Sequence, residues 1–338
     1  MMRLFLTLCI FSALAHGEET VAQQKIEQYG SAFALYVEND SRSVGGPGSD
    51  QAYTNGIKFS YIYAENRVPA WSKNSLHDLR WLRPTLDKSK VNFEISLGHQ
   101  IYTPNNTATA NFIPDDRPYS GWLFLGFATN LKEETVSHFI ELDIGMVGPS
   151  ALGKQVQNNY HKLIGVAPAE GWKNGLKDEP TLQLFYQKRF KYLSTNNFDL
   201  IPYYGAAFGN VQIGAHIGGL ARFGFNLPDD FGPSRPSASD GDSFISPNPA
   251  RDSHKLGYYI FGGARGNGIA RNIFLDGNTF QSSHHVNKYP FGFDTEVGLG
   301  FQLFPVAAIW RYVVRSPEFK ERPTFNSFAC LNIMYFLD

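Results

Sequence analysis

The sequence predicts an all-β protein, a transmembrane antiparallel up-and-down β-barrel of about twelve strands. Apolar and polar residues alternate over long segments, as in residues 91–102, 138–148 and 291–304. These segments are longer than the strands of about 5 or 6 residues that are usual in soluble proteins. Aromatic residues make up 15% of the chain and gather near the segment ends. Long alternating segments with aromatic ends are typical of a membrane barrel.

The two faces of each predicted strand differ in kind. In residues 138–148, Ile140, Leu142 and Ile144 share one face, whereas Glu141 and Asp143 share the other. In a soluble β-sandwich the apolar face would be the core and the charges would face water. Strand length and terminal aromatics, together with an export signal, favour the barrel, with apolar residues outside and charges in the interior.

The N-terminus has the pattern of a cleaved secretory signal peptide, residues 1–15. Arg3 precedes an apolar stretch from Leu4 to Leu14, and Ala13 and Ala15 form an A-x-A cleavage site. Residues 16–338 are then expected to form a single outer-membrane barrel domain. No later stretch reaches about 18 apolar residues, so no transmembrane helix is expected. Only one cysteine, Cys330, remains after cleavage, and the net charge of -1 gives no basic field for nucleic acid.

The expected strands follow one another along the whole chain. They begin near Tyr29, Ala52, Val91, Pro118, Val136, Pro180, Phe198, Gln212, Lys255, Pro290, Pro305 and Thr324. With a periplasmic N-terminus, segments 40–51, 104–117, 148–179 and 268–288 face the outside. Segments 65–90 and 227–254 then face the periplasm, although both are long for periplasmic turns.

One segment, "VQNNYHKLIG" at 156–165, breaks the alternation and predicts a short helix in an outer loop. Its apolar residues recur at helical spacing, and Gly165 is placed to end the helix. We expect the apolar face, Val156, Tyr160, Leu163 and Ile164, to pack on the barrel wall. Gln157 and His161 lie four residues apart and would then stack at the seam. A surface helix with an inert histidine is the plain alternative.

Oxygen donors concentrate where the first strand ends and the second begins. Glu38, Asn39 and Asp40 follow in succession, and Asp50, Thr54 and Asn55 open the next strand. Such a group could hold a hard cation such as Ca²⁺, or it could be ordinary turn chemistry. Adjacent strand residues point to opposite faces, so Asn39 and Asp40 can converge only where the strand ends or bulges.

Several sequence blocks together resemble the outer-membrane lipid A 3′-O-deacylases of Gram-negative bacteria. These are "ALYVEND", "YTNGIKFSY", "SLGHQIYTP", "DDRPYSGWLFLG" and "DIGMVGPSALGKQVQNNYHKLIG". They cover most of the first 175 residues in order, and the block from Gly148 to His161 is specific. The resemblance implies a twelve-stranded barrel with a Ca²⁺-dependent esterase site between the wall and a loop helix on the extracellular side.

The same resemblance implies the reaction and the residues. The family hydrolyses the ester that links an acyloxyacyl group to the 3′ position of lipid A. By motif, His161, Asn39, Asp40 and Thr54 match the catalytic residues, with Gln157 and Glu38 in supporting roles. The chemistry agrees: a neutral histidine can activate water, and Ca²⁺ held by Asp40 can stabilise the oxyanion. No G-x-S-x-G elbow is present, so direct attack by water is the favoured mechanism.

The substrate-binding residues are less sharply indicated. Residues 151–177 carry four lysines against one glutamate, and Lys154 and Lys162 are candidates for the phosphates of lipopolysaccharide in the outer leaflet. Arg117 could contact substrate or be structural, and Trp122 is expected in an aromatic girdle.

Insertion by the barrel-assembly machinery is expected, although the chain ends "MYFLD", with Phe336 two residues short of the terminal aromatic that many such barrels carry.

Two other functions compete with the deacylase. One is an outer-membrane phospholipase. The other is a non-enzymatic small channel or adhesin. Acidic residues of the interior face would suit a water-filled pore, or they could pair with Arg311 and Arg315 and fill it; these are Glu94, Glu141, Asp143, Asp294 and Glu296.

Overall fold

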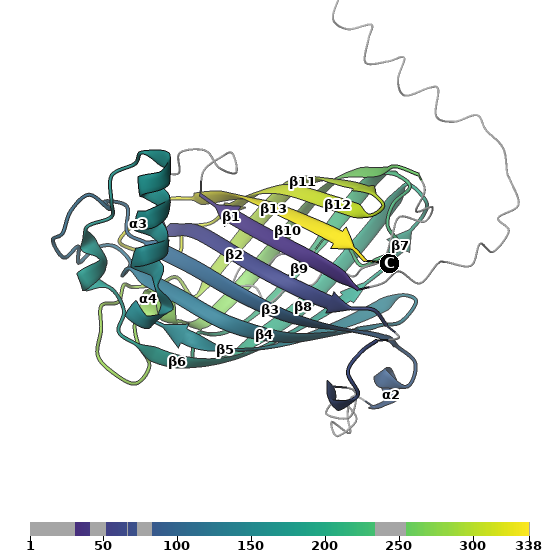
Figure 1. The fold of residues 1–338 in the computed structure, drawn as a ribbon, viewed down its shortest axis with the longest axis horizontal. Helices are drawn as coiled ribbons and strands as arrows, with labels where there is room; N and C mark the ends of the chain where they lie inside the picture. Colours follow the sequence, from purple (N-terminus) through teal and green to yellow (C-terminus); the bar gives the residue numbers. More distant parts are fainter. Residues whose placement is uncertain (1–30, 41–51, 66, 73–82, 234–254, 338) are drawn as a thin grey trace, which may run out of the picture.

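The computed structural model describes residues 31–40, 52–65, 67–72, 83–233 and 255–337, which form a closed antiparallel β-barrel (Figure 1). Twelve long strands make the wall, and the two-residue β7 extends one edge. The strands are β1 Ala32–Asn39, β2 Ala52–Tyr63, β3 Lys90–Thr103, β4 Ser120–Lys132, β5 Val136–Val147, β6 Glu179–Phe190, β7 Leu193–Ser194, β8 Phe198–Gly209, β9 Gln212–Phe225, β10 Gly257–Asn272, β11 Phe291–Leu303, β12 Val306–Arg315 and β13 Asn326–Phe336.

The barrel closes because the first strand pairs with the last. Ala32 of β1 lies opposite Phe336 of β13, and β6 pairs with β8 from Gln183 opposite Gly209. All other long strands pair with their neighbours in chain order. Each predicted strand start is confirmed to within three residues. The even number of strands brings the start of β1 and the end of β13 to the same end of the barrel (Figure 1).

The outer wall is apolar and the interior is polar, as the alternation predicts. On β11, Phe291 is 78% exposed, whereas Asp294, which faces inward, is 1% exposed. On β5, Ile144 is 50% exposed and Asp143 is 2% exposed. An apolar band around a closed sheet is stable only in contact with lipid, because in aqueous solution the whole band would be exposed to water.

Charged side chains fill the interior and pair with one another. Lys58 lies 3.3 Å from Glu94 and 2.5 Å from Glu141. Arg315 binds Asp294 at 3.0 Å, and a contact of 3.2 Å joins Arg311 to Glu296. Of the two alternatives for these charges, the structure shows pairing. Glu94 and Asp143 are at most 2% exposed, so no water-filled pore passes at their level.

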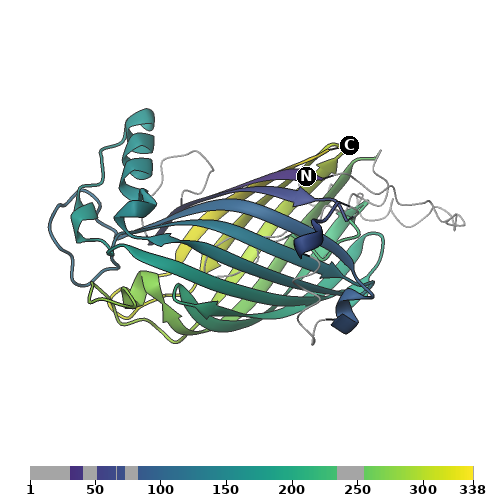
Figure 2. The same cartoon turned by 60° about the horizontal axis from the view of Figure 1, so that its bottom comes forward.

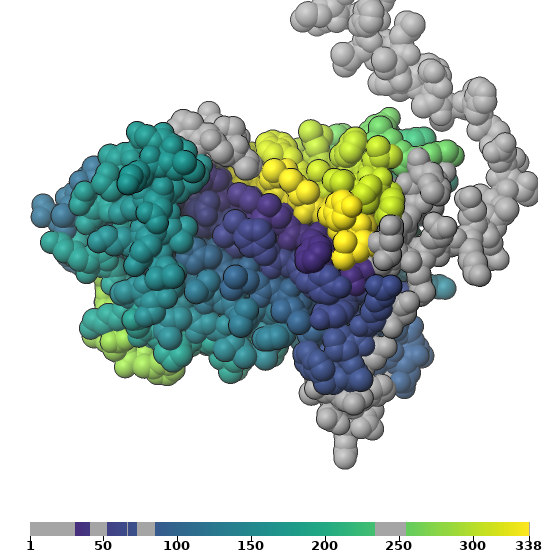
Figure 3. Space-filling view, in the orientation of Figure 1, coloured from purple at the N-terminus to yellow at the C-terminus, as the bar shows by residue number. Residues whose placement is uncertain are grey.

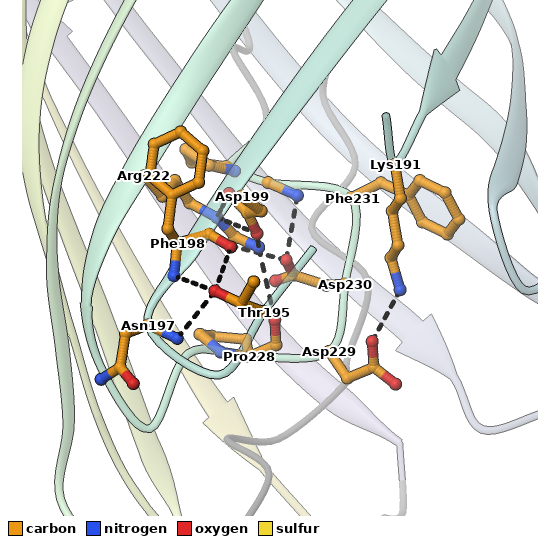
Figure 4. A network of polar contacts seen from close by, with 12 residues as sticks. Lys191, Thr195, Asn197, Phe198, Asp199, Arg222, Pro228, Asp229, Asp230 and Phe231 are labelled. Atoms are coloured by element: carbon orange, nitrogen blue, oxygen red, sulfur yellow. Dashed lines mark hydrogen bonds and ion pairs between the residues drawn. The ribbon is translucent and has the colours of Figure 1, made fainter. Parts of the chain in front are cut away.

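At the end of the barrel where β9 ends, the segment that follows β9 is bound to the strands by a network of polar contacts (Figure 4). Arg222 of β9 binds Asp199 of β8 at 2.5 Å and Asp230 of that segment at 2.7 Å. Arg189 donates to the carbonyl of Phe231 at 2.8 Å. Leu227 is buried in the same apolar cluster as interior residues such as Tyr259. The segment therefore folds into the mouth of the barrel.

The connections at the two ends differ. Helices α3, Gly153–Ile164, and α4, Ile273–Asp276, lie at one end, and α2, Arg83–Leu86, lies at the other (Figures 1 and 2). The segments predicted to share the outer side, 104–117, 148–179 and 268–288, share the α3 end, although β10 continues to Asn272. Among the described residues, none of the helices has the length and apolarity to cross a bilayer. The predicted signal peptide, residues 1–15, lies outside the described residues.

Some predicted girdle aromatics point into the barrel instead. Trp122 is fully buried, stacks on Phe124 with a centroid distance of 4.1 Å and donates its indole N–H to Thr181. Tyr102 is 2% exposed, whereas Tyr204 is 45% exposed on the outer face. The prediction for Trp122 is therefore wrong. The position of a residue near a strand end does not reveal whether its side chain points outward or into the barrel, because that depends on the register of the strand.

Candidate active site

Helix α3 follows a single 3-10 turn, η1, at Pro149–Ala151. The helix begins three residues earlier than the sequence pattern indicates and ends where that pattern predicts. Gly165 adopts a left-handed conformation, with φ of 74°, and donates its N–H to the carbonyl of His161. This conformation favours glycine because it has no Cβ to clash.

The start of α3 is fixed closely against the outer face of the barrel. A Cβ added at Gly121 of β4 would lie 3.1 Å from the Cα of Gly153, and one at Gly153 would lie 2.5 Å from the Trp172 ring. His99 of β3 donates from Nε2 to the carbonyl of Ala151 at 2.7 Å. The two glycines and this bond thus seat the helix on β3 and β4.

The orientation of α3 is the opposite of the one expected. Val156, Tyr160, Leu163 and Ile164 are 38–81% exposed, so they face away from the barrel. Gln157 and His161 are each 4% exposed, so the polar strip is the buried one. Water surrounds a soluble protein, but lipid surrounds this barrel, and an outward apolar face then costs nothing. The polar strip of the helix is thereby turned away from the surroundings.

The ring of His161 is held in a defined orientation. Its Nδ1 lies 2.7 Å from the carbonyl oxygen of Ala167. A carbonyl can only accept a hydrogen bond, so Nδ1 carries the proton and Nε2 of the neutral ring is an acceptor. The histidine therefore has the tautomer that can take a proton from water at Nε2.

The segment that supplies the Ala167 carbonyl is tied back to α3 by a reciprocal pair of hydrogen bonds. Ala169 donates its N–H to Oδ1 of Asn158 at 2.8 Å, and Nδ2 of Asn158 donates to the Ala169 carbonyl at 3.3 Å. One residue earlier in the helix, Gln157 accepts from the Trp172 indole at 2.8 Å. Asn158 therefore positions His161 through the backbone.

The amide of Gln157 is fixed in the same way. Because an indole N–H only donates, the atom facing Trp172 must be Oε1 and the other must be Nε2. In the described part of the chain, Nε2 is buried and has no hydrogen-bond partner. Buried donors without a partner are rare in proteins, so this amide is a candidate to bind a substrate oxygen.

A second group of candidate residues lies where β1 ends and β2 begins. The N–H of Asp40 donates to the carbonyl of Thr54 at 3.3 Å, and Asn39 lies opposite Asn55. Asn39 is the last residue of β1, and Thr54 is the extra residue of a β-bulge against β3. The strand end and the bulge that such a convergence requires are therefore both present at this point of the wall.

Glu38 points to the other side of the wall. Its carboxylate accepts a hydrogen bond from the hydroxyl of Tyr53, whose ring packs on the interior Phe328 at 5.3 Å between centroids. By alternation Asn39 then faces outward. Glu38 thus lies on the interior side of the wall, and its predicted supporting role stays a prediction.

The outer face of β3 lies between these two groups of residues. Thr54 Oγ1 lies 2.6 Å from Thr103 Oγ1, and His99 and Thr103 share the outward side of β3 on which α3 rests. Both are at most 7% exposed. The described contacts thus unite Asn39, Asp40 and Thr54 in one group, and Gln157 and His161 in another. The helix that carries the second group contacts β3, the strand whose Thr103 lies against Thr54 of the first group.

The predicted substrate-binding residues differ in their environment. Lys154 and Lys162 are exposed on α3, as a contact to phosphate requires. Arg117 is 1% exposed, binds Glu318 at 2.6 Å and lies 5.5 Å from the Phe319 ring centroid. This environment favours the structural role for Arg117 of the two that the sequence left open.

The whole chain was compared with protein families and with solved structures. The family model described as outer membrane protein LpxR matches residues 4–337. The chain belongs to the LpxR family. Its members are the lipid A 3′-O-deacylases of the Gram-negative outer membrane, so the chain is an outer-membrane ester hydrolase, and the family recognised from the sequence blocks is confirmed.

A solved structure of this family has the same fold. LpxR from Salmonella typhimurium is 19% identical, with a TM-score of 0.71 over 90% of this chain and 100% of that one. The COG4313 outer membrane channel from Pseudomonas putida F1 is 8% identical, with a TM-score of 0.44 over 95% of this chain and 100% of that one. No curated protein matches the sequence.

The oxygen donors of the LpxR-family site fit a hard cation. Among the described residues no three His, Cys, Asp or Glu side chains gather as metal ligands. Calcium, however, also accepts amide and backbone carbonyl oxygens and water. Asp40 and Asn39, each at most 9% exposed and side by side at a strand end, provide a carboxylate and an amide oxygen. Asp50, a further predicted donor, lies outside the described residues.

Several residues of this site could not be found from the sequence pattern. Asn158 lies next to Gln157 and resembles any helix-surface amide, and the carbonyl of Ala167 belongs to the backbone. Trp172 follows the helix in the "GW" pair that the family blocks include, which was the only available signal. His99 is a polar residue on the apolar face of its strand, an exception that would have marked it.

Replacing Asn158 by alanine should lower kcat about tenfold and leave KM nearly unchanged. The variant loses both hydrogen bonds to Ala169, each worth about 0.5–1.5 kcal/mol, and with them the fixed position of the Ala167 carbonyl. Asn158→Asp retains the hydrogen-bond acceptor, so its kcat should lie between those of the wild type and Asn158→Ala. Asn159→Ala is the matched control, because Asn159 is exposed on the same helix. Equal kcat for Asn158→Ala and Asn159→Ala would refute the positioning role.

Proposed function

We propose that this chain hydrolyses the ester that links the acyloxyacyl group to the 3′ position of lipid A, using water activated by His161. The observation that supports the mechanism is the hydrogen bond from Nδ1 of His161 to the Ala167 carbonyl, because it puts the proton of the neutral ring on Nδ1 and makes Nε2 the basic nitrogen. Family membership supports the substrate.

Each residue has a definite task in this mechanism. His161 takes a proton at Nε2 from the water that attacks the ester carbonyl, and later returns it to the leaving sugar oxygen. Gln157 donates from Nε2 to an oxygen of the ester, and Trp172 keeps that amide oriented. Thr54 positions the water or a neighbouring oxygen through its hydroxyl. The burial of these groups excludes bulk water from the reacting atoms.

Asp40 and Asn39 would hold Ca²⁺ at the end of β1. When bound, the ion supplies positive charge where the ester oxygen becomes negative. Asp40 directly follows Asn39 and both are nearly buried, so a carboxylate and an amide oxygen are available at the end of β1. Asp40 is the principal ligand in this proposal.

We infer that the α3 end of the barrel faces the cell exterior. The first strand begins and the last strand ends at the opposite end of the barrel, and the periplasmic N-terminus expected from the sequence then places α3 outside (Figure 1). The exposed Lys154 and Lys162 then lie at the level of the lipopolysaccharide phosphates. The barrel-assembly machinery would insert the chain, whose last strand ends at Phe336.

Mass spectrometry of lipid A from cells that express the chain tests the proposal. We expect loss of the 3′ acyloxyacyl group, with all other acyl chains retained. Intact lipid A in cells with a correctly folded barrel would contradict it. Release of fatty acids from glycerophospholipids in the same cells would instead establish the phospholipase.

A further inference from the structure

An apolar groove of about 460 Å³ lies on the outer face of the barrel, on the same strands that carry the candidate site. We call it the outer groove. Side chains of β1, β2 and β3 line most of it, namely Phe33, Leu35, Phe59, Tyr61, Ile95 and Leu97. These strands face the viewer in Figure 3, in purple and blue, beside the overhanging α3 loop. Its volume is within the range of about 300–1,000 Å³ typical of ligand pockets.

The outer groove has a distinct floor and rim. Leu35 and Ile95 are only partly exposed, and the small side chains of Ala34, Ser60 and Ser96 turn inward beneath it. Phe59 and Leu97 are 52% and 48% exposed and project outward beside them. The hollow therefore arises because large side chains surround a stretch of wall that smaller ones cover.

The strand register connects the outer groove to the candidate site. Leu35 lies opposite Phe59, and Phe59 lies opposite Leu97, so these three form one row across β1, β2 and β3. Asn39 is four residues further along β1 on the same outward face. At about 3.3 Å per residue, the row lies about 13 Å from Asn39, and Phe33 lies about 20 Å from it.

The outer surface of the wall between the candidate site and the outer groove is apolar, and no large side chain projects from it. Val37 and Ile57 lie opposite each other on the outward face between them, and both are partly exposed. At the end of the outer groove far from Asn39, the rings of Phe33 and Tyr61 pack together with centroids 5.1 Å apart. An elongated apolar ligand can thus extend from the site along the wall until it meets this aromatic pair.

We propose that the outer groove binds an acyl chain of the lipid whose ester lies at the His161 site, and that the Phe33–Tyr61 pair limits the length of that chain. This inference rests on the proposed function. One leaflet is about 15 Å deep, half of the hydrocarbon core of about 30 Å, so a chain that starts at the interface ends at the depth of the outer groove. The groove thereby selects the acyl group by its length.

Filling the floor tests the selection of chain length. Leu35→Trp should lower kcat/KM about tenfold on a lipid A with long 3′-linked acyl chains. The larger side chain would displace about two methylene groups of the acyl chain from the groove, and the lost burial accounts for a factor of this size. The rate on a short-chain analogue should be unchanged. Leu299→Trp, on the outer face of β11 and 54% exposed in the native chain, is the matched control. Equal loss on both substrates, or in both variants, would overturn the proposal.

A second measurement detects the bound chain without catalysis. In the His161→Ala protein, Phe59→Trp places a fluorophore at the rim, and Phe301→Trp places one on β11, where the native ring is 46% exposed. Both are reconstituted in phospholipid vesicles that contain a few per cent lipid A with brominated acyl chains. We expect stronger quenching at position 59 than at position 301, after subtraction of the parent signal.

The two experiments separate the possible failures. Equal quenching at both positions means that bulk phospholipid occupies the outer groove, which overturns the inference whether or not the wild-type protein cleaves lipid A. Cleavage by the wild type with unchanged kinetics in Leu35→Trp overturns the inference alone. Stronger quenching at position 59 supports lipid A binding there even where no hydrolysis is seen, and only the proposed function then fails.

Discussion

Replacing His161 by alanine is expected to slow hydrolysis of the 3′ ester by about 10²–10⁴-fold, the usual contribution of a positioned general base. The side chain is buried and its Nδ1 donates to the Ala167 carbonyl, so the substitution removes both the basic nitrogen and the group that this contact orients. The rate is measured on purified protein with lipid A in mixed micelles, with circular dichroism to verify the barrel.

Two further variants make the result specific. His161→Gln can still donate to the Ala167 carbonyl but has no basic nitrogen, so it should be as inactive as His161→Ala while retaining the stability of the wild type. His285→Ala removes an exposed histidine from a loop at the same end of the barrel and should be fully active. Activity of His161→Gln within about threefold of the wild type would exclude general-base catalysis by this residue.

Removal of calcium should abolish activity. In Asp40→Asn, a far higher Ca²⁺ concentration should be needed to restore it. The substitution keeps the shape of the side chain but removes the charge that a hard cation prefers. We expect kcat of the metal-saturated variant to fall about 10²–10³-fold, as for the loss of an oxyanion-stabilising group. The measurement is a Ca²⁺ titration after treatment with chelator, which also reports the half-saturating concentration.

Asp115→Asn is the matched control for this titration, because Asp115 is exposed in the loop before β4 at the same end of the barrel. Its half-saturating Ca²⁺ concentration should equal that of the wild type. Full activity of the wild type in excess chelator would rule out the metal. If Asp40→Asn left the Ca²⁺ requirement unchanged, the metal ligands would have to be other residues. Substitutions around Asp50 would then be the next to test.

The interior of the barrel argues against the competing channel function. Lys58 and Arg222 each join two acidic residues of other elements, and the segment around Asp230 folds into one mouth. These side chains leave no open path at their levels among the described residues, and they tie the wall together across the interior. The acidic residues of the interior, which are compatible with a water-filled lumen in the sequence alone, instead pair with lysine and arginine side chains that help to fill it.

The strands of the wall were predictable because their signal is local. Alternation with period two and turn residues between segments fixed the starts of all twelve strands to within three residues, and Gly165 fixed the end of the helix. The residues that bear the family resemblance marked His161 and the strand-end group. The structure places the strand-end group on the wall and His161 on a helix that contacts β3 and β4, and their catalytic roles remain a prediction for the variants above to test.

The sequence alone thus determined which segments are strands, which face of each is apolar, and where the unusual helix lies, because these properties depend on neighbours in the chain. Only the tertiary structure decided which face of α3 is buried. Helical spacing shows that the faces differ, but it does not show that lipid lies outside and a polar site lies inside. The bulge at Thr54, the inward turn of Trp122 and the carbonyl of Ala167 beside His161 likewise depend on partners distant in sequence or on the backbone, and no residue pattern encodes them.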